Sequence, residues 1–388
     1  MNVPTVDRPR GRTVRRSVSW TTAVGVVRHQ RQRSRCGLLT QQTRETTDPT
    51  TPRGARQMTP DVQDWFARRT SQAADWPLPR LLEAKGSTKV SVVLPALDEE
   101  ATVGTIVAAI RESLGEGAPH DRRLVDDLVV MDSGSTDATV QIARAAGARV
   151  VRRDGVLPRL PAVAGKGEVM WRSLAATDGD LIVFIDADLR SFTPSYLTGL
   201  LGPLLFAPEV QLVKAVYERP LVEGDLVVQA GGGRVTELVA RPLLNLHWPD
   251  LAGVVQPLAG EYAARRELLE RLPFPCGYGV ELGLLVDTYE RHGLESIAQV
   301  DLGVRQHRHH GERRLGRMAA EIMQTAYSRL AASGLPTAPA HELGTTLAQF
   351  DRVGENFAWS LHEIGGLERP PMVTIPEYHQ ARAATTSA

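Results

Sequence analysis

Cysteine is scarce in this chain. Among 388 residues only Cys36 and Cys276 are cysteines, and their sequence contexts are unrelated. Two isolated cysteines argue against a disulfide framework and against a zinc site built from cysteine pairs. The sequence also lacks an apolar run of about 18 residues, so we expect no transmembrane helix and no membrane partner. A reducing, cytoplasmic location fits this pattern best.

Lysine is absent from the first 57 residues, which hold 12 arginines and only 3 acidic residues. The segment has no apolar period, which is typical of disordered chain. Three interpretations compete with simple disorder: charge-driven binding to nucleic acid or anionic lipid, a transit-like leader, and upstream sequence before a true start at Met58. The remaining chain carries 33 basic and 42 acidic residues. It offers no second basic surface, so we expect no nucleic-acid partner.

From residue 59 short apolar strands alternate with amphipathic helices. The strands are expected at 89–96, 124–132, 148–153 and 180–189. Strands that alternate with helices of about a dozen residues predict parallel βαβ units. The fold class is therefore α/β, with an open, mostly parallel sheet and helices on both faces.

Beyond residue 210 the alternation weakens. The pattern predicts a strand near 212–220, a helix over 280–293, a last strand near 296–304 and a long amphipathic helix over 312–334. We expect four parts: a disordered extension (1–57), an α/β subdomain (58–210), a C-terminal subdomain with more helix (211–375) and a flexible tail (376–388).

Two acidic residues, separated by one residue, stand where the fourth strand ends. Asp186 and Asp188 follow the apolar run "LIVFI". Alternating strand residues face opposite ways, so both can serve one site only if the chain turns between them. Carboxylate oxygens suit a hard divalent cation that also holds substrate phosphate oxygens. The plainer alternative is a polar strand end that binds nothing.

Other polar groups follow the neighbouring strands. "PALDEE" and "MDSGSTD" end the first two, and Asp132, Ser133 and Ser135 could contact a ribose or a base. The same "SGSTD" could be only a turn with a helix cap. Lys166 stands between two glycines before a helix, where it could reach a phosphate. Because ligands of open α/β sheets bind beyond the carboxyl ends of the strands, we expect these groups to share one crevice.

Three later segments could complete the crevice. "GGGRVTEL" offers backbone N–H groups at a helix start, a guanidinium and a hydroxyl, which together suit a small anion. "CGYGVE" places Tyr278 and Glu281 before a helix that Glu281 could simply cap. "VRQHRHH" contains His307 and His309, which are either metal and anion ligands or part of a solvated loop.

In this order the segments resemble the glucosyl-3-phosphoglycerate synthases, a family of retaining glycosyltransferases with the GT-A fold. The resemblance covers about residues 60–375. It implies that the subdomain 58–210 binds the nucleotide sugar and that the subdomain 211–375 binds the acceptor. It implies transfer of glucose from UDP-glucose, or GDP-glucose, to the 2-hydroxyl of 3-phospho-D-glycerate, as the first step of methylglucose lipopolysaccharide or glucosylglycerate synthesis. It also implies a divalent metal (Mg²⁺, Mn²⁺ or Co²⁺). Together with the apolar face of the helix near 312–334, it implies a homodimer.

The resemblance assigns a role to each matching residue. It implies a uridine pocket, a metal site and an acceptor site. The uridine and sugar contacts would be Pro95, Ala96, Leu97, Glu99, Ser133, Lys166, Asp186, Tyr278 and Glu281. The metal ligands would be Asp188 and His307. The acceptor contacts would be Gly233, Arg234, Val235, Thr236 and His309. The family usually has asparagine at the positions of Asp98 and His309. This chain therefore has no side-chain amide to make the family's contact at either position.

The function and the mechanism each have alternatives. The acceptor could be a polyprenyl phosphate or another phosphorylated small molecule, or the chain could bind nucleotide sugar without catalysis. Retention could proceed through a carboxylate nucleophile, for which Glu281 is the candidate. It could instead proceed by same-face attack, in which a phosphate oxygen takes the proton of the acceptor hydroxyl. The metal held by Asp188, together with Lys166, would then stabilise the leaving group.

Overall fold

The computed structural model describes most of the chain from residue 58 onward. The described ranges are 58–119, 123–218, 221–223, 226–228, 233–304, 312–333, 346–353, 356–364 and 366–386. The arginine-rich segment 1–57 lies outside them, and so do His307 and His309. Within the described ranges, no helix combines the length and the apolarity needed to cross a membrane.

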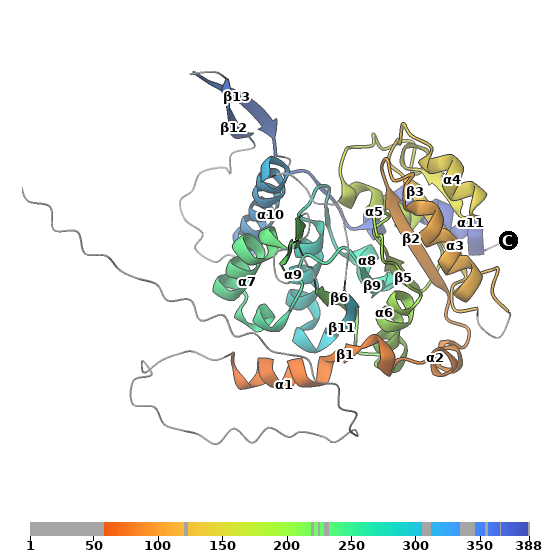
Figure 1. The fold of residues 1–388 in the computed structure, drawn as a ribbon. Helices are drawn as coiled ribbons and strands as arrows, with labels where there is room; N and C mark the ends of the chain where they lie inside the picture. Colours follow the sequence, from red (N-terminus) through yellow and green to blue (C-terminus); the bar gives the residue numbers. More distant parts are fainter. Residues whose placement is uncertain are drawn as a thin grey trace, which may run out of the picture. The chain divides into compact units, whose positions relative to one another are not determined.

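An eight-stranded sheet runs through the fold in the order β1-β11-β6-β9-β5-β2-β3-β4 (Figure 1). Every neighbouring pair is parallel except those of β9, which is antiparallel to both β5 and β6. The strands are β1 (Thr70–Gln72), β2 (Val90–Ala96), β3 (Asp127–Asp132), β4 (Arg149–Arg152), β5 (Leu181–Phe184), β6 (Leu212–Glu218), β9 (Tyr262–Arg265) and β11 (Ile297–Val304). The predicted open, mostly parallel sheet is confirmed.

Alternate residues of each strand enter two different hydrophobic cores, because successive side chains of a strand point to opposite faces. In β2, Val92 and Leu94 belong to one core and Val93 to the other. In β6, Val213 belongs to the first core and Leu212 to the second. The near-continuous apolar strands of the sequence are therefore the strands of a sheet that is buried on both faces.

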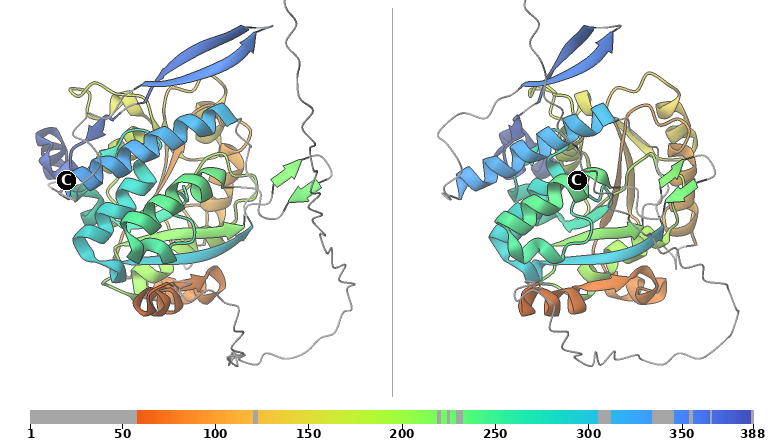
Figure 2. Two further views of the ribbon diagram at one scale, coloured as in Figure 1. Left: turned by 90° about the vertical axis from the view of Figure 1, so that its left-hand side faces the viewer. Right: turned by 60° about the vertical axis from the view of Figure 1, so that its left-hand side comes forward.

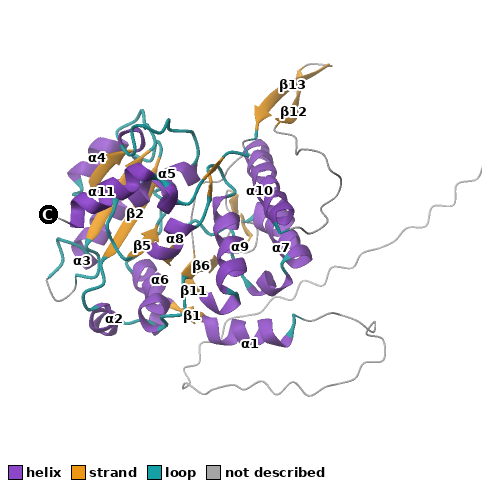
Figure 3. Cartoon of the chain, turned by 180° about the vertical axis from the view of Figure 1, so that it is seen from behind, coloured by secondary structure: helices purple, strands orange, loops and turns teal. Residues whose placement is uncertain are grey.

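Helices cover both faces of this sheet (Figures 2 and 3). One core includes residues of α3 (Val103–Leu114) and α6 (Ser195–Phe206). The other includes residues of α5 (Lys166–Ala176), α9 (Val280–His292) and α10 (Glu312–Ala332). The remaining helices are α1 (Pro60–Arg69), α2 (Leu78–Lys85), α4 (Thr139–Ala145), α7 (Arg241–His247), α8 (Arg266–Arg271) and α11 (Pro376–Thr386). Single helical turns are η1 (Ala73–Asp75), η3 (Arg153–Gly155), η4 (Thr236–Ala240), η5 (Pro249–Gly253), η6 (Leu294–Ser296) and η7 (Met372–Thr374).

Several elements differ from the sequence-based expectation. Strand β9 inserts between β5 and β6 although the pattern predicts no strand there, and β1 adds an edge strand after α1. Short strands also form three antiparallel pairs outside the main sheet. These are β7 (Leu221–Glu223) with β8 (Leu226–Val228), β10 (Phe274–Pro275) with β14 (Glu368–Arg369), and β12 (Thr346–Val353) with β13 (Asn356–Glu363).

The expected domain limits also change. Strands β6, β9 and β11 follow residue 210 in the chain and share the sheet with the earlier strands, so that position separates no independent domain. Residues 376–386, expected as a flexible tail, form α11. Tyr378 of that helix is buried, and its hydroxyl bonds to the carboxylate of Glu270. The buried ring of Tyr378 anchors this helix to the rest of the fold.

An ion triad with two buried members, Arg329 and Asp287, joins α9, α10 and β14. The Arg329 guanidinium of α10 donates to both carboxylate oxygens of Asp287 in α9, each at 2.8 Å, and it also pairs with Glu368 in β14. The side chains of Arg329 and Asp287 are each 9% exposed. Removing one member of a buried pair leaves the other charge without its partner in a poorly hydrated place. The triad therefore fixes α10 against the helix that carries Glu281.

We expect Arg329→Leu to lower the free energy of unfolding by about 3 kcal/mol, because it leaves the buried Asp287 carboxylate without its cation. Denaturant unfolding followed by circular dichroism measures this change. Arg271→Leu is the matched control, since Arg271 pairs with Glu267 on the surface at 2.7 Å. An exposed pair contributes less than about 1 kcal/mol. Equal losses in the two variants would contradict the role given to the triad.

Candidate functional site

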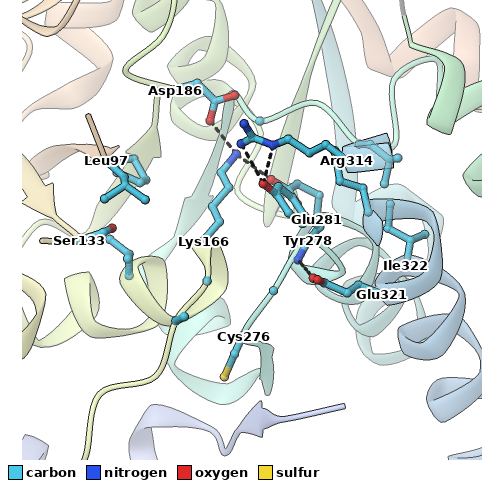
Figure 4. Close-up of a pocket in the computed structure, with 18 of the residues that line it drawn as sticks. Leu97, Ser133, Lys166, Asp186, Cys276, Tyr278, Glu281, Arg314, Glu321 and Ile322 are labelled. Atoms are coloured by element: carbon cyan, nitrogen blue, oxygen red, sulfur yellow. Dashed lines mark hydrogen bonds and ion pairs between the residues drawn. The ribbon is translucent and has the colours of Figure 1, made fainter. Parts of the chain in front are cut away.

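A cavity of about 940 Å³ lies beyond the carboxyl ends of β2, β3 and β5 (Figure 4). Pro95, Ala96 and Leu97 line it from the end of β2, and Ser133 lines it just after β3. Neighbouring parallel strands end at the same edge of a sheet, which is why polar groups far apart in the sequence meet here. The cavity therefore lies at the carboxyl ends of the strands, where the sequence analysis expected a crevice.

The chain turns directly after β5, so that both acids of "DAD" reach the cavity. β5 ends at Phe184, and a turn occupies Ala187 and Asp188. Asp186 and Asp188 are both partly buried and both line the cavity, while Ala187 between them is buried. The turn resolves the alternation that would otherwise have sent the two carboxylates to opposite faces.

Lys166 joins two carboxylates from different parts of the chain. Its ammonium lies 2.6 Å from the Asp186 carboxylate and 2.8 Å from that of Glu281, which is in the first turn of α9 (Figure 4). Burial alone would lower the pKa of Lys166, but the two carboxylates outweigh burial and hold the pKa well above its usual value. Lys166 therefore remains a cation in the folded protein.

The two glycines beside Lys166 permit a very close backbone contact. A Cβ at Gly165 would lie 2.2 Å from the Cys276 carbonyl oxygen, and one at Gly167 would lie 1.8 Å from that of Pro275. Gly165 also has a φ of +125°, which side-chain-bearing residues rarely adopt. The Gly-Lys-Gly sequence is therefore required by packing, and this packing brings Lys166 to the segment that leads into α9.

Asp98 ties the loop after β2 to the turn after β3. Its side chain accepts hydrogen bonds from the backbone N–H of Thr136 at 2.8 Å and from the Thr136 hydroxyl at 3.2 Å. Its own N–H donates to the Ser135 hydroxyl at 3.0 Å. Asp98 has a φ of +57°, a region in which Asn and Asp are enriched. Both contacts need only an oxygen acceptor, so Asp can replace the Asn that the family usually has.

The turn after β3 differs from the simple capped helix that was the plainer alternative. Ser135 and Thr136 bond to the loop after β2, and α4 begins later, after Ala138. Asp132 is buried, and one of its oxygens accepts from the Ser135 N–H at 2.9 Å. The turn thus holds Ser133 at the cavity wall.

The predicted acceptor segment forms the start of a helical stretch. Gly233 has a φ of +82°, and residues 234–240 are helical, including the π-helical turn η4. Arg234 is exposed, Thr236 is buried, and both line the cavity. The first N–H groups of a helix have no partner within the helix itself, and this geometry suits an anion.

Helix α10 supplies a cavity wall that the sequence analysis did not identify. The Glu321 carboxylate accepts from the backbone N–H of Tyr278 at 2.7 Å, and the Arg314 guanidinium donates to the Tyr278 hydroxyl at 2.9 and 3.2 Å (Figure 4). Burial raises the pKa of Glu321. The lining residues of α10 are Arg314, Leu315, Met318, Glu321 and Ile322. Residues spaced by three and four lie on one face of a helix, and this spacing is the only feature of the sequence that could have identified the face of α10 toward the cavity.

The structure brings together every described residue to which the family resemblance gives a role. Asp132 and Ser135, the other candidates for a ribose or base contact, do not line the cavity. The residues with an implied role that share this cavity are Pro95, Ala96, Leu97, Glu99, Ser133, Lys166, Asp186, Asp188, Gly233, Arg234, Val235, Thr236, Tyr278 and Glu281. His307 and His309 lie outside the described residues. Among the residues that the structure describes, no group of three or more His, Cys, Asp and Glu side chains is arranged as a complete metal site.

Sequence comparison identifies relatives along most of the chain. A family model described as glycosyl transferase family 2 matches residues 91–229. The glucosyl-3-phosphoglycerate synthase of Mycolicibacterium smegmatis is 49% identical over 80% of this chain and 98% of its own length. The synthase of Petrotoga mobilis is 44% identical over 77% of this chain and 90% of its own.

Solved structures show the same similarity. Glucosyl-3-phosphoglycerate synthase from Mycobacterium tuberculosis in complex with Mn²⁺, UDP-glucose and phosphoglyceric acid matches at 47% identity and a TM-score of 0.65, over 77% of this chain and 95% of that chain. The complex of that protein with Mg²⁺ and UDP matches at 45% identity and a TM-score of 0.68, over 79% and 98% of the two chains.

We expect Gly260→Ala to lower kcat/KM by about a hundredfold, the cost of displacing a binding group by about 1 Å. A Cβ at Gly260 would lie 2.1 Å from a carboxylate oxygen of Asp186. UDP release at low substrate concentration measures the change. Gly155→Ala is the control, because a Cβ there meets nothing within 4 Å and its φ is ordinary. A folded Gly260→Ala protein with wild-type kcat/KM would refute the requirement for a glycine beside Asp186.

Proposed function

Because the chain belongs to the family of glucosyl-3-phosphoglycerate synthases, we propose that it transfers glucose from UDP-glucose to the 2-hydroxyl of 3-phosphoglycerate. The observation that carries the proposal is the composition of one cavity. It combines the Lys166–Asp186–Glu281 cluster at the strand ends with the segment 233–236 at a helix start. Relatives in solved structures hold UDP-glucose and phosphoglyceric acid together.

The donor would lie along the strand ends. Pro95–Leu97, Glu99 and Ser133 would contact the uridine, and Asp186 would orient the nucleotide and sugar. Lys166 remains a cation and would add positive charge beside the diphosphate, whose negative charge grows as the bond to glucose breaks. Tyr278 and Glu281 would contact the glucose.

The acceptor would lie at segment 233–236. 3-Phosphoglycerate carries a phosphate and a carboxylate, so its site needs several donors. Arg234 offers a planar guanidinium, Thr236 a hydroxyl, and the helix start backbone N–H groups. His309, which lies outside the described residues, would add an imidazole donor. A small anionic acceptor suits these groups better than a polyprenyl phosphate.

A divalent metal fits the residues that are described. Asp188 lines the cavity two positions beyond Asp186 and presents a carboxylate, the donor that Mg²⁺ and Mn²⁺ prefer. His307, outside the described residues, would be the second protein ligand. When bound, such an ion neutralises charge on the departing diphosphate. Related structures contain Mn²⁺ or Mg²⁺ together with UDP.

Retention by same-face attack agrees better with the geometry than a carboxylate nucleophile does. Glu281 is 2.8 Å from the Lys166 ammonium, so one of its oxygens is already engaged by a cation. An ion-paired, buried carboxylate is a weaker nucleophile than a free one. We therefore assign Glu281 to holding Lys166 and contacting the sugar. The acceptor hydroxyl would attack as the diphosphate leaves, and a phosphate oxygen would take its proton.

A cytosolic location is part of the proposal. The free, buried thiol of Cys276 is compatible with a reducing compartment, and cell fractionation with an antibody to the chain would check it. The homodimer implied by the sequence stays a prediction.

We expect UDP release in a mixture of UDP-glucose, 3-phosphoglycerate and Mg²⁺, and no release when either the acceptor or the metal is omitted. A coupled UDP assay measures the rate, and mass spectrometry identifies the glucosylated product. UDP release that is indifferent to 3-phosphoglycerate would contradict the acceptor. Donor binding without turnover would favour a nucleotide-sugar-binding protein.

We expect Glu281→Gln to retain kcat within about tenfold of wild type, because the amide keeps the shape of a group that only positions its neighbours. Loss of a covalent nucleophile costs on the order of 10⁴-fold or more. Steady-state kinetics at saturating substrates measure the ratio. Glu267→Gln is the control, since that carboxylate pairs only at the surface with Arg271. A loss of 10⁴-fold would establish Glu281 as the nucleophile.

A further inference from the structure

A second lysine lies buried beneath the cavity. Lys214, in the middle of β6, is 1% exposed, and it does not line the cavity itself. Its strand neighbours are Gln299 in β11 and Tyr262 in β9. In the sequence it stands within an apolar run, "LVKAVY", where a polar side chain would normally mark a solvent face. Both faces of this sheet are covered, so its burial needs a reason.

The Lys214 ammonium contacts two groups. It donates to the carbonyl oxygen of Ala259 at 2.7 Å and lies 4.6 Å from the centre of the Tyr262 ring. The Tyr262 hydroxyl in turn lies 3.7 Å from the sulfur of Met170. Ala259 is fully buried, so a carbonyl without its donor would be costly there.

We propose that Lys214 is a positioning residue for the sugar end of the donor: by holding the Ala259 carbonyl, it fixes the turn at residues 256–260 against the Asp186 carboxylate. This inference rests on the proposed glucosyl transfer.

The turn connects Lys214 to the cavity. The Ala259 N–H donates to the Gln256 carbonyl at 3.0 Å, which closes the turn. Leu258 and Gly260, on either side of Ala259, both line the cavity. Gly260 approaches Asp186 so closely that a Cβ there would lie 2.1 Å from a carboxylate oxygen. A shift of Ala259 therefore moves the wall against which Asp186 rests, and Asp186 holds Lys166.

Burial of this lysine has a cost that an apolar residue would not have. Burial lowers the pKa of Lys214 to about 7, although the nearby carboxylates of Glu281, Glu261 and Asp186 oppose the shift and Lys166 adds to it. A costly buried amine with a specific contact, next to a binding cavity, is a pattern of functional sites. Its effect should therefore appear in donor binding rather than in folding alone.

The test replaces Lys214 by methionine, which has similar length and no donor. We expect Lys214→Met to raise the KM for UDP-glucose about tenfold, an effect of about 1.4 kcal/mol, while the KM for 3-phosphoglycerate stays within about twofold of wild type. Val213→Ala is the control on the same strand, because Val213 packs in the core on the opposite face of the sheet. A purely structural role would lower the active fraction, and hence kcat, without changing the KM for the donor.

Calorimetry separates this inference from the proposed function. Lys214→Met should weaken UDP-glucose about tenfold and UDP less than twofold, and neither measurement needs the acceptor. If wild-type protein fails to transfer glucose to 3-phosphoglycerate, the proposed function fails while the comparison of the two ligands still decides the role of Lys214. Unchanged affinity for UDP-glucose, or equal losses for both ligands, would overturn it. Lys214→Gln is measured by the same criteria if the methionine variant does not fold.

Discussion

The site depends on one cation shared by two carboxylates. Lys166 begins α5, Asp186 follows β5 and Glu281 lies in the first turn of α9, so a single ammonium connects three elements. Removing Lys166 would leave two carboxylates facing each other without their cation, where an unpaired charge is costly. The cluster is thus both a structural joint and the part of the cavity suited to a diphosphate. Because the cluster has both roles, the distances between its three charged groups must be fixed. Backbone contacts between the elements that carry them fix these distances.

Those backbone contacts come from glycines and from a second buried charge network. Gly165 and Gly167 let α5 lie directly against Pro275 and Cys276. Just behind Lys166, the buried carboxylate of Glu168 accepts from Arg172 at 2.6 Å and from Arg369 of β14 at 2.6 Å. Burial would raise the pKa of Glu168, but these guanidinium groups lower it, so it stays ionised. Helix α5 therefore cannot slide without breaking charged hydrogen bonds at both ends of its first turn.

The sequence predicts the half of the site that follows from strand order. Ser133, Asp186 and Asp188 end apolar strands, and the carboxyl ends of parallel strands must meet at one edge. It does not predict Lys214 or Glu321, because each looks like an ordinary polar residue of its own element. Their burial results from β9 entering the sheet and from α10 packing over the cavity, and both are contacts between segments distant in the sequence. Local sequence patterns indicate where a helix or strand lies and where a helix begins. They do not indicate which distant segments pack against each other.

The two ends of the cavity are held in different ways, and this difference bears on specificity. In the proposed function, the donor end rests on strand termini and on the ion pairs of Lys166, so a change of donor would have to be accommodated by the sheet itself. In the same proposal, the acceptor end is formed by the helix start at Gly233 and by the face of α10 that carries Arg314, both of which line the cavity. Side chains on a helix surface change without disturbing the sheet, so a change of acceptor requires fewer rearrangements than a change of donor. We therefore propose that acceptor specificity is set by residues 233–236 and by α10, and that the paired acids after β5 serve the chemistry common to all donors.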